Sequence, residues 1–143
     1  MDAVTNVPPP VNEPIRQYAP GSQDRAVLEA RVKEMAGERA ELTMTAGGRQ
    51  QMGGGDRVQV VQPHNHRHVL GEFSNVTDQD VSAAINAARE AAPGWRALSF
   101  DDRAAVFLKA AELLAGPWRA TVNAATVLGQ SKEIGRASCR ERV

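Results

Sequence analysis

Apolar side chains recur at helical spacing between Ser99 and Gly129, and this stretch has the clearest pattern in the chain. Ser99 is a candidate N-cap, because Asp102 lies three residues later, where a carboxylate also favours the positive end of a helix. Gly116 ends the first predicted helix, and Pro117 fits the first turn of a second one, which ends at Gly129. The apolar positions are Ala104, Phe107, Leu108, Ala111, Leu114 and Ala115 in the first helix and Trp118, Val122, Ala125 and Leu128 in the second.

A helix near the start of the chain is predicted over residues 23–36, with Ser22 as its cap and Gly37 at its end. Glu29 and Lys33 lie one turn apart in the order that favours an ion pair. The buried stripe that we expect on this helix consists of Val27, Leu28, Val32 and Met35.

Thr77 is the predicted cap of a later helix, with Asp78 and Asp80 in its first turn. Pro93–Gly94 is expected to stop this helix. The apolar positions expected to be buried are Val81, Ala84, Ile85, Ala88 and Ala92. In the linker that follows, the side chains expected to anchor the chain onto the core are Trp95 and Leu98.

Between these helices apolar residues recur at every second position, which is typical of strands. Apolar and polar residues alternate over 41–46, Gly47–Gly48 predicts a hairpin turn, and a short return strand is expected over 49–52. Gly53–Gly55 is read as a turn between strands. Two further strands are expected, one with Val58, Val60 and Val61 and one from Val69 to Phe73.

The first residues, 1–21, predict an extended arm, because their prolines forbid a continuous helix. We expect Val11, Ile15 and Tyr18 to hold this arm locally, without any chemistry of its own. The prolines concerned are Pro8, Pro9, Pro10, Pro14 and Pro20.

Three histidines, His64, His66 and His68, are the one conceivable metal site in the sequence, since an extended segment would place them on one face. Pro63 and Asn65 favour a turn instead, and no cysteine or carboxylate cluster completes a coordination sphere. We therefore favour a connector, with metal binding as the alternative.

Composition excludes several classes of protein. The chain has 143 residues, the size of one domain, and 17 basic residues against 17 acidic ones, so no broad charge marks it for nucleic acid or a membrane surface. No apolar run reaches the roughly 20 residues of a membrane span. The first residues resemble neither a signal nor a transit peptide, so we expect the cytoplasm of a bacterium.

A resemblance to aldehyde dehydrogenases is carried by the stretch SFDDRAAVFLKAAELLAGPWRATVNAATVLGQSK, which runs from Ser99 to Lys132. Within that family, the resemblance is more specifically to the branch that oxidises L-glutamate γ-semialdehyde. The similarity covers nearly all of residues 1–132, including NEPIRQYAPGS (Asn12–Ser22) and VVQPHNHRHVLGEF (Val60–Phe73). A match of this length without gaps is specific.

The resemblance implies an α/β fold, of which this chain is the N-terminal portion: an arm, a helix, a small antiparallel β region and then three helices. It implies a parent enzyme, expected to be a homo-oligomer, that uses NAD to oxidise L-glutamate γ-semialdehyde (1-pyrroline-5-carboxylate) to L-glutamate in proline catabolism. In that family a cysteine thiolate attacks the aldehyde, hydride passes to the nicotinamide, and an activated water hydrolyses the thioester. These residues belong beyond Lys132, so we assign no catalytic, cofactor-binding or metal-binding residue to this chain.

The last residues, 133–143 (EIGRASCRERV), lose all periodicity, and the resemblance stops at Lys132. They resemble a translated sequencing adapter, and we expect a non-native tail, with a genuine basic tail as the alternative. The only cysteine, Cys139, lies here and does not match the family's catalytic motif, so we reject it as the nucleophile. The chain thus divides into an arm (1–21), a dehydrogenase part (22–132) and this tail.

Two expectations follow for the chain by itself. Without the parent's catalytic groups it is expected to have no dehydrogenase activity. Because the apolar stripes of its last two helices are expected to face a missing domain, we predict marginal stability, partial unfolding or aggregation. The competing hypothesis is a small non-catalytic helical interaction module, complete as written, which requires residues 133–143 to be genuine.

Overall fold

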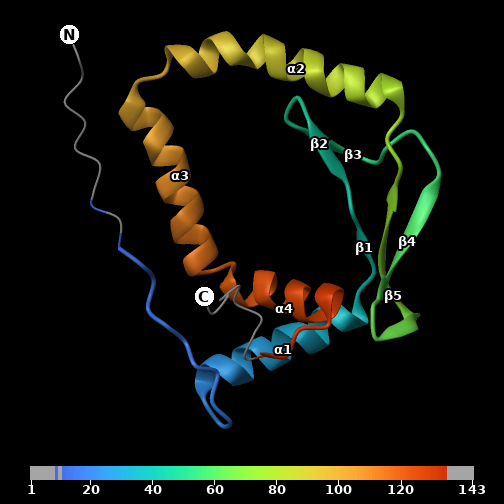
Figure 1. The fold of residues 1–143 in the computed structure, drawn as a ribbon, viewed down its shortest axis with the longest axis vertical. Helices are drawn as coiled ribbons and strands as arrows, with labels where there is room; N and C mark the ends of the chain where they lie inside the picture. Colours follow the sequence, from blue (N-terminus) through green and yellow to red (C-terminus); the bar gives the residue numbers. More distant parts are fainter. Residues whose placement is uncertain (1–8, 10, 135–143) are drawn as a thin grey trace.

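The computed structural model describes residue 9 and residues 11–134, and in it the helices and strands follow the sides of an open ring (Figure 1). Helix α4 lies beside α1, α3 connects α4 to α2, and the strands close the remaining side. The elements are α1 (Gln23–Gly37), β1 (Ala40–Glu41), β2 (Met44–Ala46), β3 (Arg49–Gln51), β4 (Arg57–Gln62), β5 (Asn65–Ser74), α2 (Asp78–Ala97), α3 (Phe100–Ala115) and α4 (Arg119–Gln130). The predicted order of arm, helix, β region and three helices is confirmed.

The strands form two small sheets. One has the order β1-β5-β4, with β4 antiparallel and β1 parallel to β5, and the other is the antiparallel β2–β3 hairpin. The predicted turn at Gly47–Gly48 is confirmed, and both glycines have positive φ, +57° and +75°, as a two-residue hairpin turn requires. The predicted antiparallel β region is present in the β2–β3 and β4–β5 pairs, and β1 adds a parallel pairing with β5 that was not predicted.

The predicted strand over 41–46 is interrupted, which corrects the sequence reading. Residues Ala40 and Glu41 pair with β5, whereas Met44–Ala46 pair with β3, so the chain must change sheets between them. Leu42 lies at this crossing and is 46% exposed. Gly71 allows the close approach of β1 to β5, since a Cβ at this position would lie 2.3 Å from the carbonyl oxygen of Ala40.

The three predicted side-chain caps are all confirmed. The hydroxyls of Ser22 and Ser99 accept bonds from the amides of the residues three positions on, and Thr77 and Asp80 form a reciprocal capping box. Helix α4 ends one residue later than predicted, at Gln130. Pro117 lies in the turn before α4 and not in its first turn.

Helix α2 continues through Pro93 and Gly94, where the sequence predicted its end. A proline inside a helix removes one amide donor but does not prevent the next turn if other contacts support it. Two contacts from α3 support this turn: Trp95 packs edge-on against the ring of Phe107, and Arg103 Nη1 donates to the carbonyls of Arg96 and Leu98. Trp95 and Leu98 stay 42% and 41% exposed, so their predicted burial in the core was wrong.

The apolar core lies between the arm, α1 and α4. Tyr18, Leu28 and Ala124 are its buried members, and Val32, Met35 and Ile134 pack against it. Leu28 is 1% exposed, but Val27, also predicted for this stripe, is 48% exposed. Within the described residues of the arm only Tyr18 is buried, whereas Val11 and Ile15 are 88% and 63% exposed.

The surface of α1 also differs from the prediction. Glu29 accepts a hydrogen bond from Arg25, one turn before it, and not from Lys33 within the described residues. Both orders place opposite charges on one helix face, and exposed pairs of this kind contribute little to stability.

Candidate functional site

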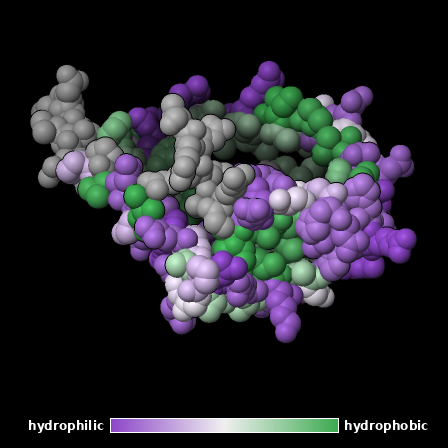
Figure 2. Space-filling view, turned by 60° about the horizontal axis from the view of Figure 1, so that its bottom comes forward, coloured by the Kyte–Doolittle hydropathy of each residue, from purple (hydrophilic) through white to green (hydrophobic). Residues whose placement is uncertain are grey.

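The most prominent surface of the molecule is the apolar side of α2 and α3. Neither helix has a buried residue within the part of the chain that the structure describes. The predicted stripe of α3 is present but uncovered, with Phe107 68% and Leu114 56% exposed. Figure 2 shows hydrophobic residues gathered at the surface between hydrophilic ones. We call the following set the open apolar face: Val81, Ile85, Trp95, Leu98, Phe100, Val106, Phe107, Leu108, Leu113, Leu114, Trp118 and Val122.

Helix α4 belongs partly to this surface and partly to the core. Leu128, one of the four predicted apolar positions, is buried. Trp118 and Val122 are 55% and 42% exposed. The side that packs on α1 carries Ala124, which lies in the core with Leu28, and Arg119 and Asn123 of the same helix are also buried. A helix with one packed side and one uncovered apolar side is typical of a segment that connects two layers.

The loop at Gly53–Gly55 uses its backbone amides within the chain. Gly54 N donates to Asp80 Oδ2 at 2.9 Å, and Gly55 N donates to the carbonyl oxygen of Asn75 at 2.9 Å. The amide of Thr77, the amide of Gly54 and the Thr77 hydroxyl bind the Asp80 carboxylate and hold its pKa below the usual value. These amides tie a turn to the start of α2, so the loop does not form a cradle for the phosphates of a nucleotide.

His64 and His68, two of the three histidines, are directed to different partners. His64 Nδ1 lies 2.7 Å from the hydroxyl of Ser131, at the end of α4, and His68 Nε2 lies 2.8 Å from the carbonyl oxygen of Ala36, at the end of α1. Over residues 11–134, no group of three metal-ligating side chains is positioned to hold an ion. The segment joins the ends of two helices to the β4–β5 hairpin, as a connector would.

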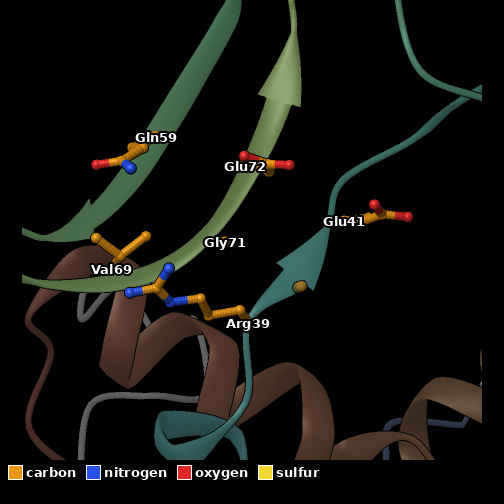
Figure 3. Close-up of a pocket in the computed structure, with 7 residues that line it drawn as sticks. Arg39, Glu41, Gln59, Val69, Gly71 and Glu72 are labelled. Carbon is orange, nitrogen blue, oxygen red and sulfur yellow. The ribbon is translucent and has the colours of Figure 1, made fainter.

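A depression of about 270 Å³ lies on the β1-β5-β4 sheet (Figure 3). The guanidinium of Arg39 points across β5 toward Val69, while Glu41 points away on the far side of β1. Glu72 forms an ion pair with Arg57, so its charge is already compensated. The depression is therefore lined by one positively charged side chain and two carboxylates, one of which is already paired with an arginine. These groups do not form a catalytic pair.

Sequence reasoning missed one cluster, in which the hydroxyl of Tyr18 accepts hydrogen bonds from Arg119 and Asn123. A local signal for it existed, because an arginine at the first position of a helix opposes the helix dipole and needs a compensating group. Cys139, which the sequence led us to reject as a nucleophile, lies outside the described residues. None of the helices in the described part of the chain combines the length and hydropathy needed to cross a bilayer.

Comparison with known proteins gives consistent matches. The sequence model of the aldehyde dehydrogenase family matches residues 50–139. Delta-1-pyrroline-5-carboxylate dehydrogenase of Agaricus bisporus is 38% identical over 136 residues, which are 94% of this chain and 25% of that protein. The human mitochondrial enzyme of the same name is 35% identical over 88% of this chain and 22% of its own length.

Solved structures agree with the sequence matches. The crystal structure of the delta-pyrroline-5-carboxylate dehydrogenase from Mycobacterium tuberculosis bound with NAD has 51% identity and a TM-score of 0.91, covering 96% of this chain and 26% of that one. The structure of a mutant of Thermus thermophilus 1-pyrroline-5-carboxylate dehydrogenase has a TM-score of 0.83 at 24% identity, which shows the fold alone. The chain thus spans about a quarter of the length of these relatives. Since the family match covers more than half of the chain, this protein belongs to the aldehyde dehydrogenase family.

Proposed function

We propose that the chain is the N-terminal part of an NAD-dependent dehydrogenase that oxidises L-glutamate γ-semialdehyde to L-glutamate in proline catabolism. The observation that carries the proposal is the 51% identity over 96% of the chain with the Mycobacterium tuberculosis delta-pyrroline-5-carboxylate dehydrogenase, whose crystal structure is bound with NAD. Among family relatives, identity at this level favours a shared substrate class.

The described residues do not supply the chemistry themselves. Their glycine-rich loop at Gly53–Gly55 bonds to Asp80 and Asn75, and several of their titratable groups form caps and ion pairs. The proposed role of this chain is therefore structural: its open apolar face packs on the part of the enzyme that carries the cofactor and the nucleophile. Burial of such a face contributes about 25 cal/mol per Å² of apolar surface.

Several narrower points belong to the same proposal. We propose the cytoplasm as the compartment, a homo-oligomer as the assembled state, and no nucleic-acid or membrane partner, as the balanced charge supports. Some relatives carry the word mitochondrial in their names, so fractionation of the source cells is the direct test of the compartment. We also propose that residues 133–143 are a non-native tail, although the family match extends to residue 139.

The first experiment is to amplify and read the genomic DNA across the codon of Lys132. We expect the frame to continue into a long dehydrogenase whose sequence departs from residues 133–143. A stop codon directly after Val143 would contradict both the tail and the enzyme proposal for this chain, and would support a small interaction module.

The second experiment compares NAD reduction by the long gene product and by the 143-residue chain, with L-glutamate γ-semialdehyde as substrate. We expect activity in the long product alone. Replacement of Cys139 by serine in the chain is the matched control and should change nothing, because the nucleophile lies elsewhere. Activity of the clean chain that disappears on Cys139→Ser would overturn the assignment.

A further inference from the structure

The arm is fixed at one strained residue. Tyr18 has φ +50°, in the left-handed region that residues other than glycine seldom adopt, and it is only 6% exposed. Such a conformation is energetically unfavourable and persists only where the surroundings impose it. The strain therefore indicates that contacts around Tyr18 hold the arm in place.

Those contacts are polar and join segments distant in sequence. The Tyr18 hydroxyl accepts from Arg119 Nε at 3.2 Å and from Asn123 Nδ2 at 2.9 Å, and all three side chains are buried. Glu13 forms an ion pair with the same Arg119. Burial lowers the pKa of Arg119, but its bonds to Tyr18 and Glu13 outweigh this effect, so the pKa is raised and the guanidinium stays charged.

Helix α4 lacks the usual groups at its start. Its N-cap is Trp118, which makes no side-chain cap bond, and its first turn carries no acidic residue. Arg119 places a positive charge at the positive end of the helix dipole, which is unfavourable by itself. Glu13, which comes from the arm, supplies the missing negative charge.

Burial of the aliphatic side chains of the arm does not explain why the arm lies against the helices. Val11 and Ile15 are 88% and 63% exposed, so the segment touches the helices through Glu13, Tyr18 and the exposed ion pair of Arg16 with Asp24. The ring of Tyr18 also packs in the core with Leu28 of α1 and Ala124 of α4.

We propose that residues 11–18 form a strap that clamps α4 onto α1 through Tyr18 and Glu13, and that opening of the strap frays the first turn of α4. The strap couples two segments that are about a hundred residues apart. When it opens, a buried arginine loses its partners beside a helix terminus without a cap, so the arm and the start of α4 must loosen together. The inference does not depend on the enzymatic assignment, because it uses contacts of the described residues alone.

Hydrogen exchange read by mass spectrometry tests the strap on the 143-residue chain. In Tyr18→Phe we expect about tenfold faster exchange both in residues 11–18 and in the first turn of α4, with β5 unchanged. Glu13→Gln should act on the same two segments, more weakly, because the side chain of Glu13 is 46% exposed. Arg16→Ala is the matched control in the same arm; it removes an exposed ion pair with Asp24 and should leave α4 unchanged.

Three outcomes would overturn the strap. The first is an arm that loosens in Tyr18→Phe while α4 keeps its protection, and the second is a uniform increase over the whole chain. The third is a lack of protection in the first turn of α4 in the unsubstituted chain. Since Glu13 lies outside the apolar core, Glu13→Gln decides the question if Tyr18→Phe does not fold.

Discussion

The α1–α4 pair and the α2–α3 pair differ in how far they bury their apolar side chains. The first pair, with Tyr18 of the arm, provides every buried hydrophobic residue in the described part of the chain. The second pair provides none, although it carries Val81, Phe107 and Leu114 at helical spacing. Two regions of one chain thus reach opposite states of burial.

The difference does not follow the strength of the helical pattern. The apolar side chains of α1 show almost no segregation to one face, whereas those of α2 and α3 do. A helix is buried when a partner covers it, and α1 has one in α4. The relatives are about four times as long as this chain, so they contain enough further structure to cover α2 and α3.

The largest effect is expected for Leu28→Ala, in the packed pair. Leu28 is 1% exposed, and removal of such a side chain leaves a cavity that costs about 2–5 kcal/mol. Urea unfolding followed by circular dichroism measures the loss. The control is Val27→Ala on the same helix, which should cost far less because Val27 is 48% exposed. Equal losses of stability in the two variants would show that Leu28 is not part of the core that stabilises the chain.

Local signals in the sequence predicted the helix starts well. Ser22, Thr77 and Ser99 all cap as expected, because a cap depends on atoms within three residues of each other. The same applies to the hairpin turn at Gly47–Gly48, where only glycine accepts the required φ at no cost. These features would form with little help from the rest of the chain.

Long-range features could not be predicted in this way. The pairing of β1 with β5 and the burial of Arg119 and Asn123 depend on segments that are 31 to 105 residues apart. Periodicity predicted the apolar stripe of α4, but it could not show that Arg119 and Asn123 of the same helix are buried. For the candidate site, the sequence predicted the apolar stripe on α3, which the structure leaves exposed; that it faces a further domain stays a prediction.

An intermediate effect is expected at Asp80, where α2 begins. The folded-state pKa of this carboxyl lies below the ordinary value of 3.8, because the backbone amides of Thr77 and Gly54 bind the ionised form. Its stabilising contribution is therefore complete above the ordinary pKa and is lost as pH falls through the lowered one. The Asp80→Asn variant should be less stable than the unsubstituted chain at neutral pH. Its stability should also change less than that of the unsubstituted chain between about pH 5 and pH 2. Parallel curves for the two proteins would show that the capping box does not matter.

The smallest effect is expected for Leu114→Gln on α3. Leu114 is 56% exposed, so its loss should change the stability of the 143-residue chain by no more than about 0.5 kcal/mol. Light scattering by solutions of the variant should fall, because a chain with less exposed apolar surface aggregates less. In the long gene product the same change should cost about 2–5 kcal/mol if the open apolar face is covered there. Leu128→Gln, at a buried position of α4, should be costly in both proteins. A Leu114 variant that is harmless in the long product as well would show that α3 stays uncovered in the enzyme.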